Sequence, residues 1–196
     1  MTKVVIGAVA FFSIATSGAS VDSRTPIDAS VNLMFVSSQF YNGGSFQGVA
    51  GADAACQELA NAAGLAGLYK AWLSTDDVSA VVHLRSCNPG VAGWVRTDGM
   101  PFAGTLEELT STGPQNPPTL DELGNNLADK EFFSVITGTL DDGSPLPGYN
   151  CGNYTDRTAP VSVGDLRSVP RWTTNFFISG CESYYHIYCF EVDYGG

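Results

Sequence analysis

Five cysteines have the most restricted chemistry in this chain, because a thiol forms a disulfide, binds metal or acts as a nucleophile. They are Cys56, Cys87, Cys151, Cys181 and Cys189. None stands in a Cys-x-x-Cys pair, and the chain has only two histidines to complete a zinc site. The cysteines therefore predict disulfides, and their odd number leaves one thiol unpaired within the chain. Their spacing alone leaves the connectivity open.

The two histidines do not stand in a catalytic pattern. His186 lies between aromatic residues, which favours a packed or edge histidine over a general base, and His83 has no nucleophile motif near it. The carboxylates of Glu107 and Glu108 are adjacent in sequence and point apart, so they do not form a glycosidase pair. Gly-x-Ser-x-Gly, His-Glu-x-x-His and phosphate-binding glycine loops do not occur. We therefore predict that the protein is not an enzyme.

The first twenty residues predict export. Lys3 supplies a positive start, residues 4–15 carry no charge, and small residues follow. This apolar run is shorter than the roughly 20 residues that a membrane-spanning helix needs, and no cysteine follows it to accept a lipid. Residues 1–20 are thus interpreted as a cleavable signal peptide, and a secreted chain with no membrane insertion is expected after cleavage. Outside the cell, disulfide formation is the default for cysteines.

The charge of the chain excludes several classes of partner. Acidic residues outnumber basic ones 20 to 9, for a net charge of −11. Nucleic acid, heparin-like chains and anionic membranes attract clustered Lys and Arg, so none of them is expected as a partner. Solubility outside the cell is the simpler interpretation of this acidity.

The remaining residues suffice for one domain, which we place at 32–196 after an N-terminal segment at 21–31. Strands are predicted at 32–38, 65–74, 132–137, 172–178 and 184–192, and a helix from Gly51 or Asp53 to Gly64. Short helical turns are expected at 78–86 and after the capping box that begins at Thr105. A hairpin turn is expected at Asp98-Gly99. Both faces of the last strand are largely apolar, which predicts a central position in the sheet.

The stretch from Gly138 to Arg171 is rich in Gly, Pro, Asp and Asn and has no sustained periodicity. A long irregular loop in a compact domain is usually functional, so we expect the ligand there. The candidate contacts are aromatic or amide side chains in or next to it: Tyr149, Asn150, Asn153, Tyr154 and Trp172. For Trp172, packing in the core is the alternative. Asp141 and Asp142 are weak calcium candidates, with turn chemistry as their alternative.

Short motifs occur in one order along the predicted domain. They are Phe35-Val36-Ser37-Ser38, the segment 48–56, Ala62-Ala63-Gly64-Leu65-Ala66-Gly67, Tyr69-Lys70-Ala71-Trp72-Leu73-Ser74, Val95-Arg96-Thr97-Asp98-Gly99, the segment 120–124, Thr137-Gly138-Thr139, Asp142-Gly143, Cys151 with Tyr154, Trp172, and Ile187-Tyr188-Cys189-Phe190-Glu191. Together they resemble the bacterial endostatin-like domain of leptospiral surface proteins and related secreted proteins. The resemblance covers about Asn32 to Val192, and the 69–74 strand with the preceding helix is its most specific part.

The resemblance implies an α+β, C-type-lectin-like fold: a mixed, twisted sheet with one or two helices and a long loop region held by disulfides. It implies an outer bridge from Cys56 to Cys189 and an inner one from Cys151 to Cys181. Cys87 is then left either as a free thiol or for an intermolecular bridge. Family members are described as adhesins for host glycoproteins. The chain lacks the N-terminal histidines and the arginines with which animal endostatins bind zinc and heparin, so neither property is expected.

The sequence therefore predicts a secreted, non-catalytic recognition module that binds an extracellular protein or glycan through the long loop. No cofactor is expected, calcium being the one ion considered. The alternative is a structural subunit that self-associates into an extracellular fibre or surface layer through Cys87, the edge strands and residues 21–30.

Overall fold

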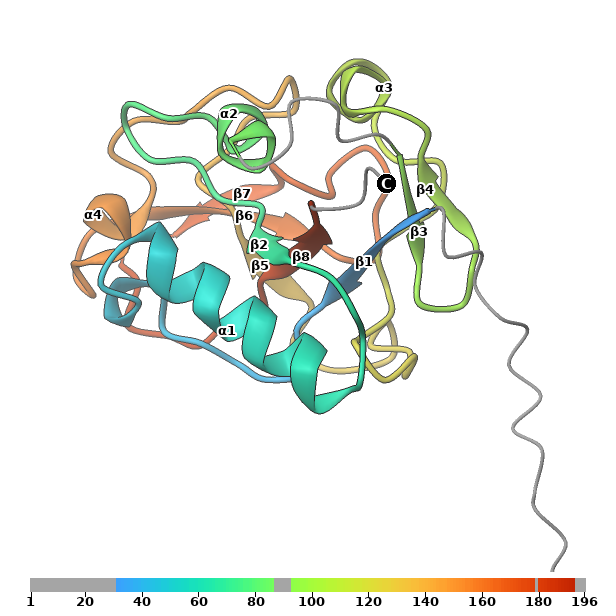
Figure 1. Cartoon of the computed structure of the whole chain (residues 1–196). Coiled ribbons are helices and arrows are strands. Elements are labelled where there is room, and N and C mark those ends of the chain that lie inside the picture. Colours follow the sequence, from blue (N-terminus) through green and yellow to red (C-terminus); the bar gives the residue numbers. More distant parts are fainter. Residues whose placement is uncertain (1–30, 87–92, 179, 193–196) are drawn as a thin grey trace, which may run out of the picture.

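We describe a computed structural model of the chain, which defines residues 31–86, 93–178 and 180–192 (Figure 1). The predicted signal peptide, residues 21–30 and Cys87 lie outside the described residues. The fold is α+β, with two sheets and short helices. The elements in chain order are β1 (Asn32–Val36), the 3₁₀ turn η1 (Gly43–Ser45), α1 (Val49–Ala62), β2 (Tyr69–Ala71), α2 (Ala80–Arg85), β3 (Trp94–Arg96), β4 (Pro101–Ala103), α3 (Leu106–Ser111), β5 (Ser134–Ile136), α4 (Cys151–Tyr154), β6 (Val161–Asp165), β7 (Phe176–Ile178) and β8 (Tyr188–Glu191).

The larger sheet has five strands in the order β2-β8-β1-β3-β4. The last strand, β8, lies between β2 and β1 and is antiparallel to both, whereas β1 and β3 are parallel. The central position predicted for the last strand is thus confirmed. Helix α1 lies across one face of this sheet, alongside β2 and β8 (Figure 1).

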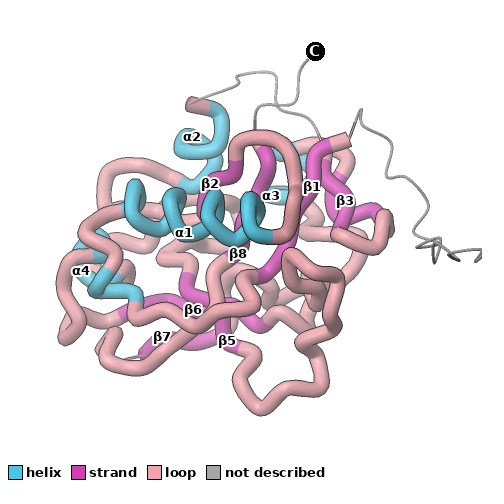
Figure 2. Tube along the Cα trace, turned by 60° about the horizontal axis from the view of Figure 1, so that its bottom comes forward, coloured by secondary structure: helices cyan, strands magenta, loops and turns pink. Residues whose placement is uncertain are grey.

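The smaller sheet has three antiparallel strands in the order β5-β6-β7, and Figure 2 shows it to one side of the larger sheet. Its middle strand corrects the prediction of an irregular run from Gly138 to Arg171, because β6 lies within that run. Val161 and Val163 of β6 are buried. The short Val-Ser-Val alternation is flanked by Pro160 and Gly164, so it becomes a strand only because β5 and β7 pair with it on either side.

The chain just before β8 connects the two sheets. His186 forms a parallel bridge with Val135 of β5, and Tyr185 forms an antiparallel bridge with Tyr41 in the loop after β1. The Ile136 amide donates to the His186 carbonyl at 3.1 Å, and the Ser37 amide donates to the Ile187 carbonyl at 2.9 Å. One continuous segment therefore belongs to both sheets.

The core consists of two apolar clusters on opposite faces of β8. Tyr188 and Phe190 belong to the cluster that holds Trp72, Trp94 and Trp172. The other cluster contains β8 residue Cys189 and the buried residues of α1, which are Ala52, Ala55, Cys56, Leu59 and Ala60. Both faces of β8 are buried, as the apolar pattern predicted.

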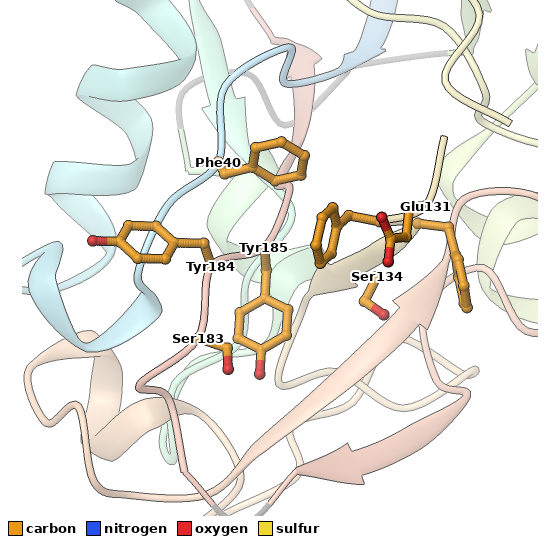
Figure 3. Close-up of a pocket in the computed structure, with 8 residues that line it drawn as sticks. Phe40, Glu131, Ser134, Ser183, Tyr184 and Tyr185 are labelled. Atoms are coloured by element: carbon orange, nitrogen blue, oxygen red, sulfur yellow. The ribbon is translucent and has the colours of Figure 1, made fainter. Parts of the chain in front are cut away.

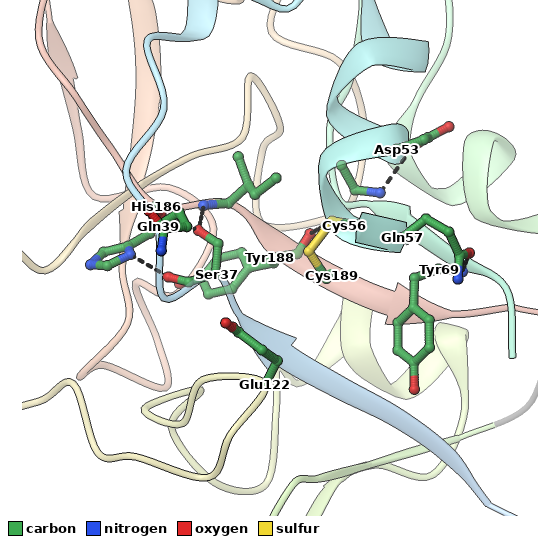
Figure 4. Close-up of a disulfide and its surroundings, with 12 residues drawn as sticks. Ser37, Gln39, Asp53, Cys56, Gln57, Tyr69, Glu122, His186, Tyr188 and Cys189 are labelled. Carbon is green, nitrogen blue, oxygen red and sulfur yellow. Dashed lines mark hydrogen bonds between the residues drawn. A yellow bond between two sulfur atoms is a disulfide. The ribbon is translucent and has the colours of Figure 1, made fainter. Parts of the chain in front are cut away.

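Two disulfides fasten this core. Cys56 of α1 is bonded to Cys189 of β8 across 133 residues of sequence, with Cα atoms 5.4 Å apart (Figure 4). Cys151 is bonded to Cys181 across 30 residues, with Cα atoms 5.7 Å apart. These are the pairs that the family resemblance implies. By constraining the unfolded chain, such loops contribute about 4 to 5 and about 3 to 4 kcal/mol, respectively.

Local chemistry fixes the helix ends. Helix α1 begins at Val49, earlier than predicted, after Gly48 with a φ of 102°. Gly51 is required in its first turn, because a Cβ there would lie 1.9 Å from the Phe46 carbonyl oxygen. At α3, the Glu108 amide donates to the Thr105 hydroxyl at 3.0 Å, as the capping box predicts. None of the helices in the described part of the chain is long and apolar enough to cross a membrane.

Candidate functional site

Two of the predicted ligand contacts lie inside the molecule. The Tyr154 side chain is fully buried, and its hydroxyl donates to the carbonyl oxygens of Ser74 and Thr137, both at 2.9 Å. Burial raises the pKa of this phenol well above its ordinary value. Trp172 is buried beside Trp72, with ring centroids 5.1 Å apart. Tyr154 is thus a core residue and not the ligand contact predicted for it, and for Trp172 the alternative of packing in the core is confirmed.

The segment that holds Tyr154 is a left-handed turn. Cys151, Gly152, Asn153 and Tyr154 have φ values between 56° and 64°. The amides of Tyr154 and Thr155 donate four residues back, to the carbonyls of Asn150 and Cys151. Residues with a Cβ adopt this conformation at a cost of roughly 1 to 2 kcal/mol each. The Cys151–Cys181 disulfide, the buried Tyr154 hydroxyl and the asparagine contacts described next hold it in place.

Asn150 and Asn153 use their amides within the protein. The Asn150 side chain accepts from the Asn153 amide at 2.8 Å and donates to the Asp76 carboxylate at 2.9 Å. Asp76 also accepts from the Gly148 amide at 2.8 Å, and the Asp76 amide donates to the Asn153 side chain at 2.8 Å. These hydrogen bonds, led by that of Gly148, lower the pKa of Asp76. The two asparagines therefore tie the long loop to the chain after β2.

The remaining predicted residues of the long loop are at the surface. Tyr149 is exposed and packs on Phe177 of β7, with ring centroids 5.1 Å apart. Asp142 accepts from the Ser144 hydroxyl and amide, which lowers the pKa of its carboxyl group. Asp141 is exposed beside it. Within 31–86, 93–178 and 180–192, no three His, Cys, Asp or Glu residues are grouped so that they could hold a metal ion.

A concave surface lies outside the long loop, and we call it the aromatic cleft. It has a volume of about 470 Å³ and is drawn in Figure 3. Its lining comes from the loop after β1, the chain leading into β5 and the chain before β8: Phe40, Glu131, Phe132, Phe133, Ser134, Ser183, Tyr184 and Tyr185. In Figure 3, the rings of Phe40 and Tyr185 lie on the side of Ser134 and Glu131, whereas the Tyr184 ring points the other way; the Tyr185 hydroxyl lies next to that of Ser183.

Three of these rings are accessible to a ligand. Phe40 is 42% exposed, Phe132 59% and Tyr184 61%. The ring centroids of Phe40 and Phe132 are 5.7 Å apart and the ring planes are inclined at 76°, so the two rings are in edge-to-face contact. Aromatic faces exposed together bind other rings, sugar faces or cations. Apolar groups gathered on a concave surface mark a binding site more often than scattered ones do.

Backbone hydrogen bonds fix the three segments that carry these rings. Tyr41 and Tyr185 exchange amide-to-carbonyl bonds of 2.7 and 2.9 Å, next to Phe40 and Tyr184. The His186 amide donates to the Ser134 carbonyl at 3.1 Å, close to Phe132. The backbone that carries the rings is therefore already ordered, so less backbone entropy is lost when a ligand binds.

The buried side chain of His186 links the loop after β1 to the chain that leads into β5. Its Nδ1 is 2.6 Å from the Ser37 carbonyl oxygen, its Nε2 is 3.3 Å from that of Phe132, and its ring lies 4.4 Å from the ring of Phe40. The side chain is buried, and this burial lowers the pKa of the imidazole. A packed histidine, rather than a general base, is what the strand context predicted.

The polar groups of the cleft are few. Glu131 is the one charged residue among those that line it. A smaller hollow of about 240 Å³ adjoins the cleft, shares Phe40 and Tyr184 with it, and contains Arg157. Burial raises the pKa of the Tyr185 phenol. The lining consists of aromatic rings, two serines and one glutamate, an arrangement that suits binding of a ligand.

The Cys151–Cys181 disulfide lies next to two of the segments that line the cleft. Cys181 stands two residues before Ser183, and its partner Cys151 opens the left-handed turn. Gly43, in the loop after Phe40, packs against this disulfide so closely that a Cβ there would lie 2.6 Å from the Cys151 sulfur. The loop after β1 and the chain before β8 therefore lie against one cross-link.

Phe40, Phe132 and Tyr184 were not among the ligand contacts predicted from the sequence, although two of them belong to a pattern that indicates exposed rings. Phe132-Phe133 and Tyr184-Tyr185 are pairs of adjacent aromatics at the start of predicted strands. Successive side chains of an extended chain point to opposite sides, so one ring of each pair must face outward. Tyr185 is buried and Tyr184 is exposed, as this rule requires. Phe40 also has an aromatic neighbour, Tyr41, but this pair lies in a turn-rich stretch outside the predicted strands, where the alternation of sides does not apply.

Comparisons with known proteins leave the ligand open. No protein-family model matches the chain, and no curated protein matches it. The chemistry of the aromatic cleft therefore carries the functional argument.

Proposed function

We propose that this protein is a secreted, non-catalytic recognition module that binds an extracellular glycoprotein or glycan. The observation that carries the proposal is the aromatic cleft, where the exposed side chains of Phe40, Phe132 and Tyr184 lie on three segments joined by backbone hydrogen bonds. Concave, mostly apolar surfaces with a few polar groups are the usual form of ligand sites. The two disulfides are compatible with a location outside the cell.

The proposed binding surface is the aromatic cleft and not the long loop. Asn150, Asn153 and Tyr154 of that loop make internal hydrogen bonds, and this favours a supporting role for it. The loop contributes the left-handed turn and the Cys151–Cys181 bridge, which lie against the chain that carries Tyr184. Tyr149 remains as its exposed aromatic residue.

We also propose that the fold is C-type-lectin-like, as the resemblance implies. A helix bonded by Cys56 to the last strand, and a second disulfide whose loop is nested within the first, support this assignment. In such a fold the function depends on the surface carried by the loops and not on the framework itself.

An array of glycans and extracellular matrix proteins, probed with calcium and with chelator, tests the recognition function. Wild-type protein is compared with Phe132→Ala and Tyr184→Ala, and with Phe177→Ala as a matched loss of an exposed ring outside the cleft. Each cleft variant should weaken binding about two- to tenfold, since an aromatic contact contributes about 0.5 to 1.5 kcal/mol.

The control variant should bind as wild type, and all variants should keep the wild-type unfolding temperature. No captured ligand with or without calcium, or equal losses for Phe177→Ala and Phe132→Ala, would refute the assignment to the cleft.

A second candidate function is self-association, and one observation favours it. Strand β7 is at the edge of the smaller sheet, and its side chains Phe176 and Phe177 are exposed beside Tyr149. Exposed apolar edge strands are templates for pairing with another chain. Light scattering of wild type and Phe177→Lys, with non-reducing electrophoresis to detect bridging through Cys87, tests it. A wild-type monomer at high concentration would exclude this candidate.

A further inference from the structure

The aromatic cleft has the shape and charge of a site for an organic cation. The rings of Phe40 and Phe132 are in edge-to-face contact, with centroids 5.7 Å apart and planes inclined at 76°, so a group placed beside the pair can reach a ring face. The face of an aromatic ring is electron-rich and attracts a positive charge within about 6 Å of its centroid. With a volume of about 470 Å³, the cleft has room for a compact cation and the chain attached to it.

The electrostatics of the cleft point in the same direction. Glu131 carries the one charge among the lining residues, and it is negative. The whole chain adds a net charge of −11, which raises the local concentration of cations and repels anions. Arg157 lies in the adjoining hollow, beyond Phe40 and Tyr184. A cation in the cleft therefore meets aromatic rings and a carboxylate, whereas Arg157 lines the adjoining hollow.

We propose that the aromatic cleft binds a quaternary ammonium group, held by Phe40 and Phe132 and by the carboxylate of Glu131. This inference rests on the proposed recognition function and specifies the ligand chemistry at the same cleft. A quaternary ammonium fits better than a primary amine, because its methyl groups bury apolar surface against the rings while its charge stays within reach of their faces. The ligand is thereby distinguished from a neutral sugar and from an anionic headgroup.

Calorimetric titration of the oxidised full chain with choline tests the inference. Its neutral isostere 3,3-dimethyl-1-butanol has the same shape without the charge and is the matched control. Choline should bind about fivefold or more tightly than the isostere. Higher salt should reduce this difference, because Glu131 and the net charge are exposed to screening.

Variants locate the charge preference within the cleft. Glu131→Gln should weaken choline binding and leave the isostere unchanged. Phe132→Leu keeps an apolar side chain but removes the ring face, so it should reduce the preference for choline over the isostere. Phe177→Leu removes an exposed ring outside the cleft and should change neither ligand. Equal affinity for choline and the isostere, or an unchanged preference in Glu131→Gln, would overturn the inference.

Three further probes identify the source of the group. Free choline, a peptide with trimethyllysine and vesicles of phosphatidylcholine present the same cation as a small molecule, a protein side chain and a lipid headgroup. Binding of any of them that choline competes away supports the inference. If array ligands bind through Phe132 and Tyr184 but choline neither binds nor competes, the cation inference fails while the recognition function stands. If the array also gives nothing, both fail.

Discussion

At the scale of single residues, His186 combines structural and electrostatic roles behind the cleft. Both of its ring nitrogens face carbonyl oxygens, those of Ser37 and Phe132. A neutral imidazole has one N–H and can donate to only one of them, whereas the charged form could donate to both. Burial nevertheless lowers the pKa of His186, so desolvation of the charged form outweighs the second hydrogen bond.

This lowered pKa predicts how stability changes with pH. Above the ordinary value of 6.5, His186 is neutral in both folded and unfolded chains and contributes no pH dependence. Below 6.5 the unfolded chain takes up the proton first, so the free energy of unfolding falls as the pH falls and levels off below the folded pKa. Urea unfolding at pH 7 and pH 5 should show this decrease in wild type, and a smaller one in His186→Gln.

His83→Gln is the matched loss of the other histidine. The carboxylates with lowered pKa, such as Asp76 and Asp98, lose their contribution only below their ordinary value of 3.8, outside this window. A pH dependence of stability that persists in His186→Gln and disappears in His83→Gln would show that His83, and not His186, is its source.

At the scale of elements, the two disulfides have different roles. Cys56–Cys189 joins α1 to the central strand and acts on the whole core. Cys151–Cys181 joins the left-handed turn to the chain that leads to Ser183 and Tyr184. The outer bridge therefore governs global stability, and the inner one also governs the position of one side of the cleft.

Paired alanine substitutions separate these roles. Cys56→Ala with Cys189→Ala should lower the free energy of unfolding by about 2 to 5 kcal/mol, with little effect on ligand affinity while the chain remains folded. Cys151→Ala with Cys181→Ala should also be destabilising, and it should weaken binding at the cleft because the Tyr184 segment loses its anchor. Chemical unfolding and titration with a ligand from the array measure both quantities.

Equal effects of the two double variants on affinity would contradict the separate roles. Gly43→Ala provides an independent check, because its added methyl group would displace the inner disulfide while leaving both cysteines in place. This variant should weaken binding in the same direction as loss of the inner bridge.

At the scale of the whole molecule, β8 and the residues before it make the two sheets one cooperative unit. The Trp72 amide donates to the Tyr188 carbonyl at 3.0 Å beside the larger sheet, and the Ile136 amide donates to the His186 carbonyl at 3.1 Å in the smaller one. Both core clusters include residues of β8. Opening either sheet therefore disturbs the same strand.

Native-state hydrogen exchange should report this coupling. The amides of Trp72 and Ile136 should exchange with opening free energies that agree within about 1 kcal/mol, because both require global unfolding. Their protection should fall together when denaturant is added. Much weaker protection of Ile136 would show instead that the smaller sheet opens on its own.

Sequence patterns predicted the local elements whose signals lie within a few residues. The apolar spacing of α1, the capping box at Thr105, the Asp98-Gly99 turn and the two-sided apolar pattern of the last strand each act over short range, and the structure contains all of them. The family resemblance added the disulfide pairs, which spacing alone left open.

Contacts between distant segments determine which polar and aromatic side chains are buried and which remain exposed. Tyr154 and Trp172 have the residue types of ligand contacts, but partners distant in sequence bury them. Phe40, Phe132 and Tyr184 come from three separate segments, and they form one cleft because the chain before β8 pairs with both of the others. Pairing between distant segments depends on the whole fold, so no local pattern reveals it.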